Sequence, residues 1–128
     1  MDAIVYGTIA SLGFATLENL TYVFSGSSEV DSFTIAVIRA ISAIPLHACC
    51  GIIMGYFFGL HIFLGSKSAL IKSLIIPISI HAAYNYLTGF GFLWFYFLFA
   101  VMLYAQSLHK RVADLQQTKL MERENQII

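Results

Sequence analysis

Residues 13–22 read GFATLENLTY and place a carboxylate, Glu18, and an amide, Asn19, inside an apolar run from residue 3 to residue 24. About 20 apolar residues in a helix, at ~1.5 Å each, cover the ~30 Å hydrocarbon core of a bilayer. A carboxylate at the centre of such a helix costs on the order of 2.5–3.5 kcal/mol on insertion scales. We therefore expect Glu18 to have a buried partner or a chemical role.

The composition is typical of an integral membrane protein. Of the 128 residues, 59% are hydrophobic and 11% are charged, whereas a soluble domain has about 25% charged residues. The formal net charge is zero, so no nucleic-acid partner is indicated. Cys49 and Cys50 are adjacent within an apolar run, so we expect no disulfide framework. The lipid bilayer is the partner that this composition predicts.

Three further apolar runs follow the first, and together they predict an all-α polytopic membrane helix bundle with about four transmembrane helices. The predicted spans are residues 3–24, 33–64, 69–87 and 90–104. The second run is longer than one span requires, and Pro45 within it is expected to kink the helix. The predicted organisation is a transmembrane domain at residues 1–107 and a polar helical tail at residues 108–128.

Basic residues predict the orientation of the bundle. Lys67 and Lys72 flank the second connection, and Lys110 and Arg111 follow the last apolar run, whereas the first loop, residues 25–32, is acidic. The positive-inside rule therefore places the second connection and the tail in the cytoplasm and the first loop outside. The sequence predicts a multi-pass protein of the cell membrane with a cytoplasmic C-terminal tail.

A stripe of glycines lies in the second apolar run, with Gly51, Gly55 and Gly59 at four-residue spacing. Small residues at this spacing let another helix approach closely. The simplest interpretation is packing within the bundle, and the same stripe also offers a contact for a homo-oligomer.

Four polar residues in the other apolar runs are candidate partners of Glu18: Arg39, His47, His81 and Asn85. Counting the rise per residue places Glu18, Arg39 and His81 about 10 Å below the outer ends of their helices, but His47 about 20 Å below. His81 and Asn85 are four residues apart and share one helix face. We therefore predict a polar cluster in the outer half of the membrane, from which His47 stands apart unless a tilt or the kink lifts it.

Several roles are open for this cluster on the residues alone. Glu18 and Arg39 can form a pair that only fixes helix packing, and the histidines and asparagines can make interhelical hydrogen bonds. Glu18, His47 and His81 can instead ligate a catalytic metal, since a zinc site needs three N or O ligands and an open position. Without a metal, the carboxylate can act as a base while a histidine and an asparagine hold an oxyanion. Titratable groups in a membrane can also form a proton or ion pathway.

Three motifs occur in order: FxxxEN from Phe14 to Asn19, HxxxG from His47 to Gly51, and HxxxN from His81 to Asn85. Together with DAIVYG at residues 2–7, they resemble the PrsW family of intramembrane proteases over roughly residues 2–85. This family belongs to a wider group with the CAAX-prenyl proteases and the bacteriocin-processing proteins. The resemblance argues against an ion pathway, because a pore does not need these motifs.

The resemblance implies an intramembrane protease that hydrolyses a peptide bond of a membrane-anchored protein such as an anti-sigma factor. The implied active-site residues are Glu18, His47, His81 and Asn85. The first three would activate water through a metal, with zinc as the candidate cofactor, and Asn85 would stabilise the oxyanion. Asn19 and Arg39 would position substrate or balance the carboxylate charge.

The family pattern also includes a paired-glutamate motif, EExxK or EExxxR, on a segment before DAIVYG. This sequence contains no adjacent glutamates. In the wider group that pair is the best candidate for the base that activates water. The sequence therefore carries a second expectation, a fragment or a non-catalytic membrane scaffold or immunity-type protein built on the same helices.

Overall fold

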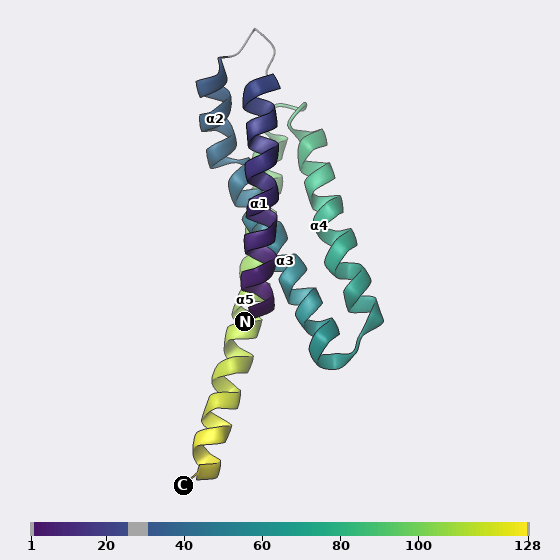
Figure 1. Ribbon diagram of the computed structural model, residues 1–128, viewed down its shortest axis with the longest axis vertical. Coiled ribbons are helices and arrows are strands. Elements are labelled where there is room, and N and C mark those ends of the chain that lie inside the picture. The colour runs from purple at the N-terminus through teal and green to yellow at the C-terminus, as the bar shows by residue number, and fades with distance from the viewer. Residues whose placement is uncertain (1, 26–30, 128) are drawn as a thin grey trace.

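The computed structural model describes residues 2–25 and 31–127, and these ranges are helical apart from short connections. The helices are α1 (Asp2–Ser25), α2 (Ser32–Ile41), α3 (Ala43–Leu64), α4 (Lys67–Leu87) and α5 (Leu93–Ile127). Helix α3 is central and packs against all four others, with its largest contact to α1. Figure 1 shows α5 continuing well past the N-terminus of α1. The prediction of an all-α fold is confirmed.

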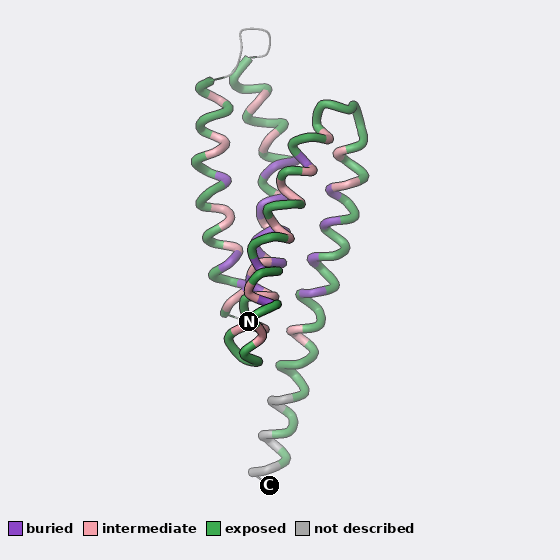
Figure 2. The backbone as a smooth tube through the Cα atoms, turned by 90° about the vertical axis from the view of Figure 1, so that its right-hand side faces the viewer, coloured by how far each residue is buried: buried purple, intermediate pink, exposed green. Residues whose placement is uncertain are grey.

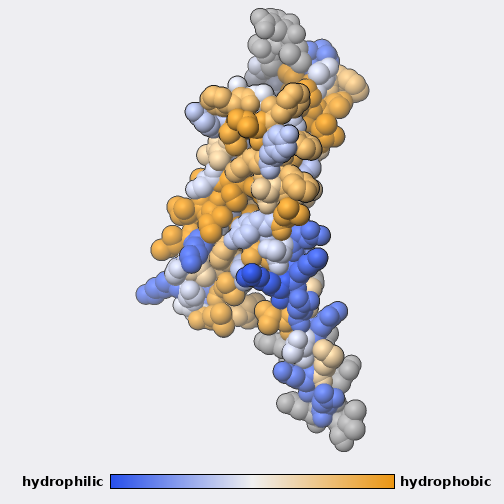
Figure 3. Space-filling model, turned by 180° about the vertical axis from the view of Figure 1, so that it is seen from behind, coloured by the Kyte–Doolittle hydropathy of each residue, from blue (hydrophilic) through white to orange (hydrophobic). Residues whose placement is uncertain are grey.

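By length and composition, one stretch among the described helices is long and apolar enough to cross a membrane: Ser32–Leu64, which comprises α2 and α3. Large apolar side chains are nevertheless exposed along the whole bundle, as expected for surfaces that face lipid. Figure 3 shows apolar residues over much of the upper face and polar residues gathered lower down, toward the C-terminal part of α5. The number of four spans stays a prediction.

The second apolar run breaks where Pro45 predicts a kink. Helix α2 ends at Ile41, Ser42 has φ −119° and ψ −62°, and α3 begins at Ala43. Pro45 therefore lies in the first turn of α3, where its missing N–H leaves no helical hydrogen bond unmade. The Ser42 hydroxyl donates to the carbonyl oxygen of Ile38 at 2.7 Å, so the polar side chain at the break is satisfied.

Polar caps define the ends of the helices beside the connections. The Asp31 carboxylate accepts hydrogen bonds from the hydroxyl and the backbone N–H of Thr34, at 2.6 Å and 2.9 Å. Because these bonds favour the charged form, they hold the pKa of Asp31 below its ordinary value. At the other end, Gly65 closes α3 with φ +65° and Ser66 caps α4. Gly65 and Ser66 therefore make the whole connection between α3 and α4.

Glycine lets α1 and α3 touch backbone to backbone. A Cβ on Gly7 would lie 2.6 Å from the carbonyl oxygen of Gly51, and a Cβ on Gly55 would collide with the carbonyl oxygen of Ala3. Further along the contact, the Ser11 hydroxyl donates to the carbonyl oxygen of His47 at 2.7 Å. The predicted packing role is thus confirmed for two glycines of the stripe, and homo-oligomerisation through it stays a prediction.

Helix α5 packs through one regular seam of buried side chains. Leu98, Val101, Ala105 and Leu108 are buried, at alternating spacings of three and four residues. They join Leu46 and neighbouring residues of α3 in the core, and Figure 2 shows the buried positions on the inward-facing sides of the helices. No break in α5 marks residue 107, so the division into a domain and a tail stays a prediction.

Candidate active site

Three helices bring Glu18, His47 and His81 together. Glu18 comes from α1, His47 from α3 and His81 from α4. His47 Nε2 lies 3.0 Å from Glu18 Oε2, and His81 Nε2 lies 3.3 Å from Glu18 Oε1. The two imidazole ring centroids are 4.8 Å apart. The cluster that the sequence predicts therefore forms, and His47 belongs to it.

The depth of about 20 Å counted for His47 left its membership of the cluster open, because counting rise per residue ignores the direction of side chains. The bond between Ser11 and the His47 carbonyl places the His47 backbone level with Ser11, which is about 10 Å of helix rise from Glu18. Side chains lean toward the N-terminus of their own helix. Since α1 and α3 run antiparallel, Glu18 and His47 lean toward each other and close this gap.

Arg39 of α2 ties three side chains of α1 together. Its Nη2 donates to Glu18 Oε2 at 2.8 Å, and its Nε donates to Asn19 Oδ1 at 2.6 Å. Its guanidinium carbon also lies 3.8 Å from the centroid of the Tyr22 ring. The predicted pairing of Arg39 with Glu18 is confirmed, while sequence reasoning assigned no role to Tyr22. The available signal was spacing, since Tyr22 follows Glu18 by four residues on the same face.

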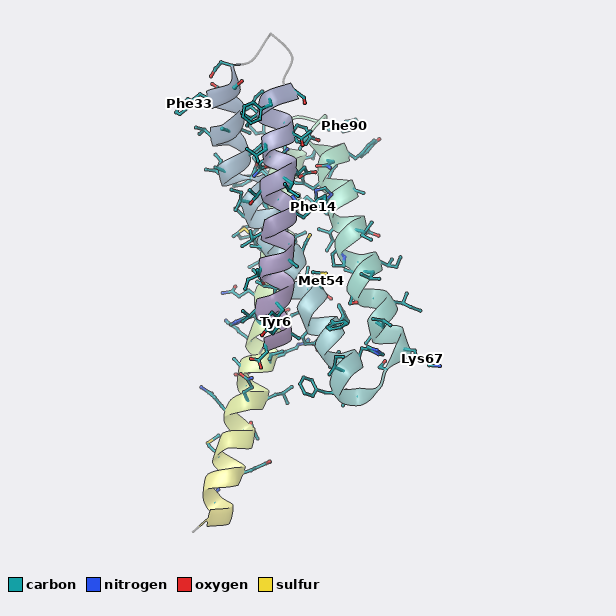
Figure 4. All side chains as sticks on the ribbon, viewed as in Figure 1. Tyr6, Phe14, Phe33, Met54, Lys67 and Phe90 are labelled. Carbon is teal, nitrogen blue, oxygen red and sulfur yellow. The ribbon has the colours of Figure 1, made fainter. Side chains whose placement is uncertain are left out.

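The cluster is largely shielded by protein. The side chains of Glu18, Arg39 and His47 are 15%, 13% and 4% exposed. Phe14, one turn before Glu18 on α1 and labelled in Figure 4, adds an aromatic wall with its ring 5.8 Å from that of His47. A carboxylate so enclosed is stable only with charged or hydrogen-bonding partners. Every buried side-chain N and O atom in the described part of the chain has such a partner.

Asn85 lies one turn beyond His81 on α4. Its residue is exposed, and its side chain makes no hydrogen bond within residues 2–25 and 31–127. It lines a groove beside Arg39, toward the end of the bundle where α1 ends and α2 begins. This end is called the α1–α2 end below. The predicted role of Asn85 stays a prediction.

The cluster fits the requirements of a metal site. Glu18, His47 and His81 each offer one ligand atom, and these atoms lie within 4.8 Å of one another. Two imidazoles and a carboxylate are a ligand set of catalytic zinc sites, in which ligand atoms ~2.0–2.1 Å from a tetrahedral ion lie about 3.3 Å apart. The 3.0 Å and 3.3 Å separations from His47 and His81 go to different oxygens of Glu18, and with one ligand atom from each residue the three atoms lie within 4.8 Å of one another.

Comparison with known proteins places this site in a family. A protein-family model described as "PrsW family intramembrane metalloprotease" matches residues 1–107, a range that contains the whole cluster. The chain is 35% identical over 106 residues to Protease PrsW of Bacillus subtilis, covering 80% of the chain and 46% of that protein. It is 33% identical over 98 residues to Protease PrsW of Clostridioides difficile, covering 73% and 41%.

A third relative is Protease PrsW of Geobacillus kaustophilus, which is 35% identical over 113 residues and covers 85% of the chain and 48% of that protein. The chain thus spans less than half the length of these curated relatives. No solved structure gives a significant match. The match of the family model over the helices that carry the cluster shows that this chain belongs to the PrsW family of intramembrane metalloproteases.

Proposed function

We propose that this chain forms the catalytic core of an intramembrane metalloprotease that hydrolyses a peptide bond of a membrane-anchored protein, such as an anti-sigma factor. The observation that carries the proposal is the convergence of three ligand atoms within 4.8 Å from three different helices. The family match supports protease chemistry at this cluster. The protein would sit in the cell membrane as a multi-pass bundle with its C-terminal tail in the cytoplasm.

Glu18, His47 and His81 would hold a divalent metal, with zinc as the candidate. Such a metal, when bound, lowers the pKa of a bound water and polarises the scissile carbonyl. Among the chain's own groups, Arg39 binds Glu18 Oε2 and fixes the orientation of the carboxylate. Glu18 Oε1 is the oxygen that Arg39 leaves free, and it faces His81 Nε2 at 3.3 Å.

Two amides complete the proposed site. Asn19 accepts a hydrogen bond from Arg39 Nε and so holds the guanidinium against Glu18. Asn85 follows His81 by one turn, and we assign to its amide N–H the stabilisation of the developing oxyanion. Arg39 balances the charge of the carboxylate, which lowers the cost of keeping Glu18 among apolar helices.

A second candidate is a non-catalytic membrane scaffold or immunity-type protein. The observation that favours it is that the buried polar side chains of the described residues already satisfy one another. In that case the Glu18–Arg39 pair and the two histidines serve to hold the bundle together.

The test is the zinc content and peptidase activity of the purified chain and of Glu18→Gln, with fluorescently labelled casein as substrate. The protease proposal predicts about one zinc per chain. Replacing a second-sphere partner lowers metal affinity or activity about 10–100-fold, so replacing the ligand itself should lower both by at least about 100-fold. Glu122→Gln, the same exchange at an exposed position of α5, is the matched control and should change neither.

The two candidates give opposite results in this experiment. A folded chain that holds no metal and leaves casein intact would contradict the protease proposal and favour the scaffold. His81→Ala adds a second criterion, since loss of metal with retained folding identifies a ligand, whereas loss of the fold identifies a packing role.

A further inference from the structure

A groove of about 670 Å³ lies next to the cluster, toward the α1–α2 end and between α1, α2 and α4. Its volume is within the ~300–1,000 Å³ range of small-molecule and cofactor sites. Arg39 lines it and also bonds to Glu18, so this one side chain belongs to both the groove and the cluster.

The walls of the groove continue the helix faces that carry the cluster. On α1, Tyr22 and Ser25 follow Glu18 by four and seven residues, and both line the groove. On α4, Asn85 and Thr88 follow His81 at the same two spacings and line it as well. Residues at these spacings share one face of a helix. A chain segment in the groove therefore lies directly beyond the cluster.

The chemistry of the walls suits a polypeptide backbone. Ile35, Ile38 and Tyr84 give the groove apolar sides. Arg39 uses Nε and Nη2 in its bonds to α1, so Nη1 and the amide of Asn85 are donors without a partner among the described residues. An extended segment presents carbonyl oxygens that have no internal partner, whereas a helix has already bonded its own. Within apolar surroundings such carbonyls need donors from the protein.

We propose that this groove binds the substrate polypeptide as an extended, unwound segment next to the scissile bond. Arg39 Nη1 donates to a main-chain carbonyl oxygen of this segment, the Asn85 amide donates to the carbonyl at the scissile bond, and Ile35 and Ile38 contact its side chains. The inference rests on the proposed protease function and adds what the enzyme recognises: a stretch without helical hydrogen bonds, bound at the α1–α2 end.

Neighbouring residues of α2 provide a matched test. The groove face of α2 and the residue after it carries Ile35, Ile38, Arg39 and Ser42. Because a helix turns by about 100° per residue, Val37 points to the opposite side. Ile38 and Val37 are similarly exposed, at 49% and 45%. We expect Ile38→Trp to fill the groove and to raise the KM for labelled casein at least about 10-fold. Val37→Trp should leave KM within about 2-fold, and both variants should keep the zinc content of the unmodified chain.

A crosslinking measurement separates the groove from the chemistry. A diazirine analogue of leucine, close in size to isoleucine and valine, is placed at position 38 or at position 37 in the Glu18→Gln background, and casein is added under ultraviolet light. Crosslinks confined to position 38 support the groove, even if the unmodified chain cleaves nothing and the protease proposal fails. If casein is cleaved and the cleavage depends on Glu18, the protease proposal stands. Equal crosslinking at both positions, or equal KM for both tryptophan variants, would then overturn the proposal that the groove binds substrate. No cleavage and no preference for position 38 overturns both.

Discussion

The guanidinium group of Arg39 contacts three side chains of α1, and these contacts stabilise a charged pair between apolar helices. It donates to Glu18 and Asn19 and covers the ring of Tyr22. Removing one partner of a buried ion pair leaves the other charge uncompensated, and this typically costs about 3–5 kcal/mol.

Arg39→Met should therefore lower the free energy of unfolding by about 3–5 kcal/mol, because it strands the carboxylate of Glu18. The double variant with Glu18→Gln should lose less than the sum of the two single changes, since neither charge then remains. Unfolding in detergent, followed by circular dichroism, measures these differences. Arg111→Met, at an exposed position of α5, is the control. Additive losses in the double variant would show that the pair is not coupled.

Sequence reasoning identified the members of the cluster better than their positions. Glu18, His47 and His81 each stand out as polar residues in apolar runs, so their convergence was predictable. The depth of His47 was not predictable. Side chains tilt toward the N-terminus of their own helix, so two of them approach each other only if their helices pack antiparallel, and the sequence alone does not give the pairing of the helices. Tyr22 was not assigned to the cluster, although its spacing of four residues from Glu18 places both on one helix face.

At the scale of the elements, the contact between α1 and α3 positions two of the three cluster residues. Its closeness depends on glycine, since a Cβ on Gly55 would strike the backbone of Ala3, whereas one on Gly59 would meet only the Ala3 Cβ at 3.5 Å. The glycine stripe is therefore not uniform, although its members look equivalent in the sequence.

Gly55→Ala should push α1 away from α3 and destabilise the bundle by about 1–3 kcal/mol, the usual cost of overpacking. Gly59→Ala has room for its methyl group and should be neutral or stabilising by up to about 1 kcal/mol, since alanine favours helix. Thermal unfolding in detergent compares the two variants. Equal melting temperatures would contradict the close approach at Gly55.

The observed ends of the helices agree closely with the predicted spans where an apolar run ends at a capping residue. The break at Ser42 lies three residues before Pro45, because a proline is accommodated in the first turn of a helix and the chain bends before it. The continuity of α5 was harder to predict. Its seam includes the small Ala105 and then passes into a polar sequence, so apolar residues alone suggested that the packed helix stops near residue 104.

At the scale of the whole molecule, the distribution of basic residues predicts which end of the bundle faces the cytoplasm. Single cysteines in a chain without Cys49 and Cys50 test this. Phe33→Cys at the α1–α2 end should react with a membrane-impermeant maleimide in intact cells, and Ser68→Cys near the start of α4 should react only after permeabilisation. Both positions are exposed. The reverse labelling pattern would invert the proposed topology and move the cluster to the cytoplasmic half.

The pairing of Arg39 with Glu18 also bears on how the protein is made. The pair needs only α1 and α2, whereas the cluster is complete only when His81 of α4 arrives. During synthesis, the first two helices can thus enter the bilayer with their charges already neutralised by each other. The ribosome must add α3 and α4 before Glu18, His47 and His81 can meet. The order of the helices along the chain therefore lets the charged pair form first and the three-residue cluster form afterwards.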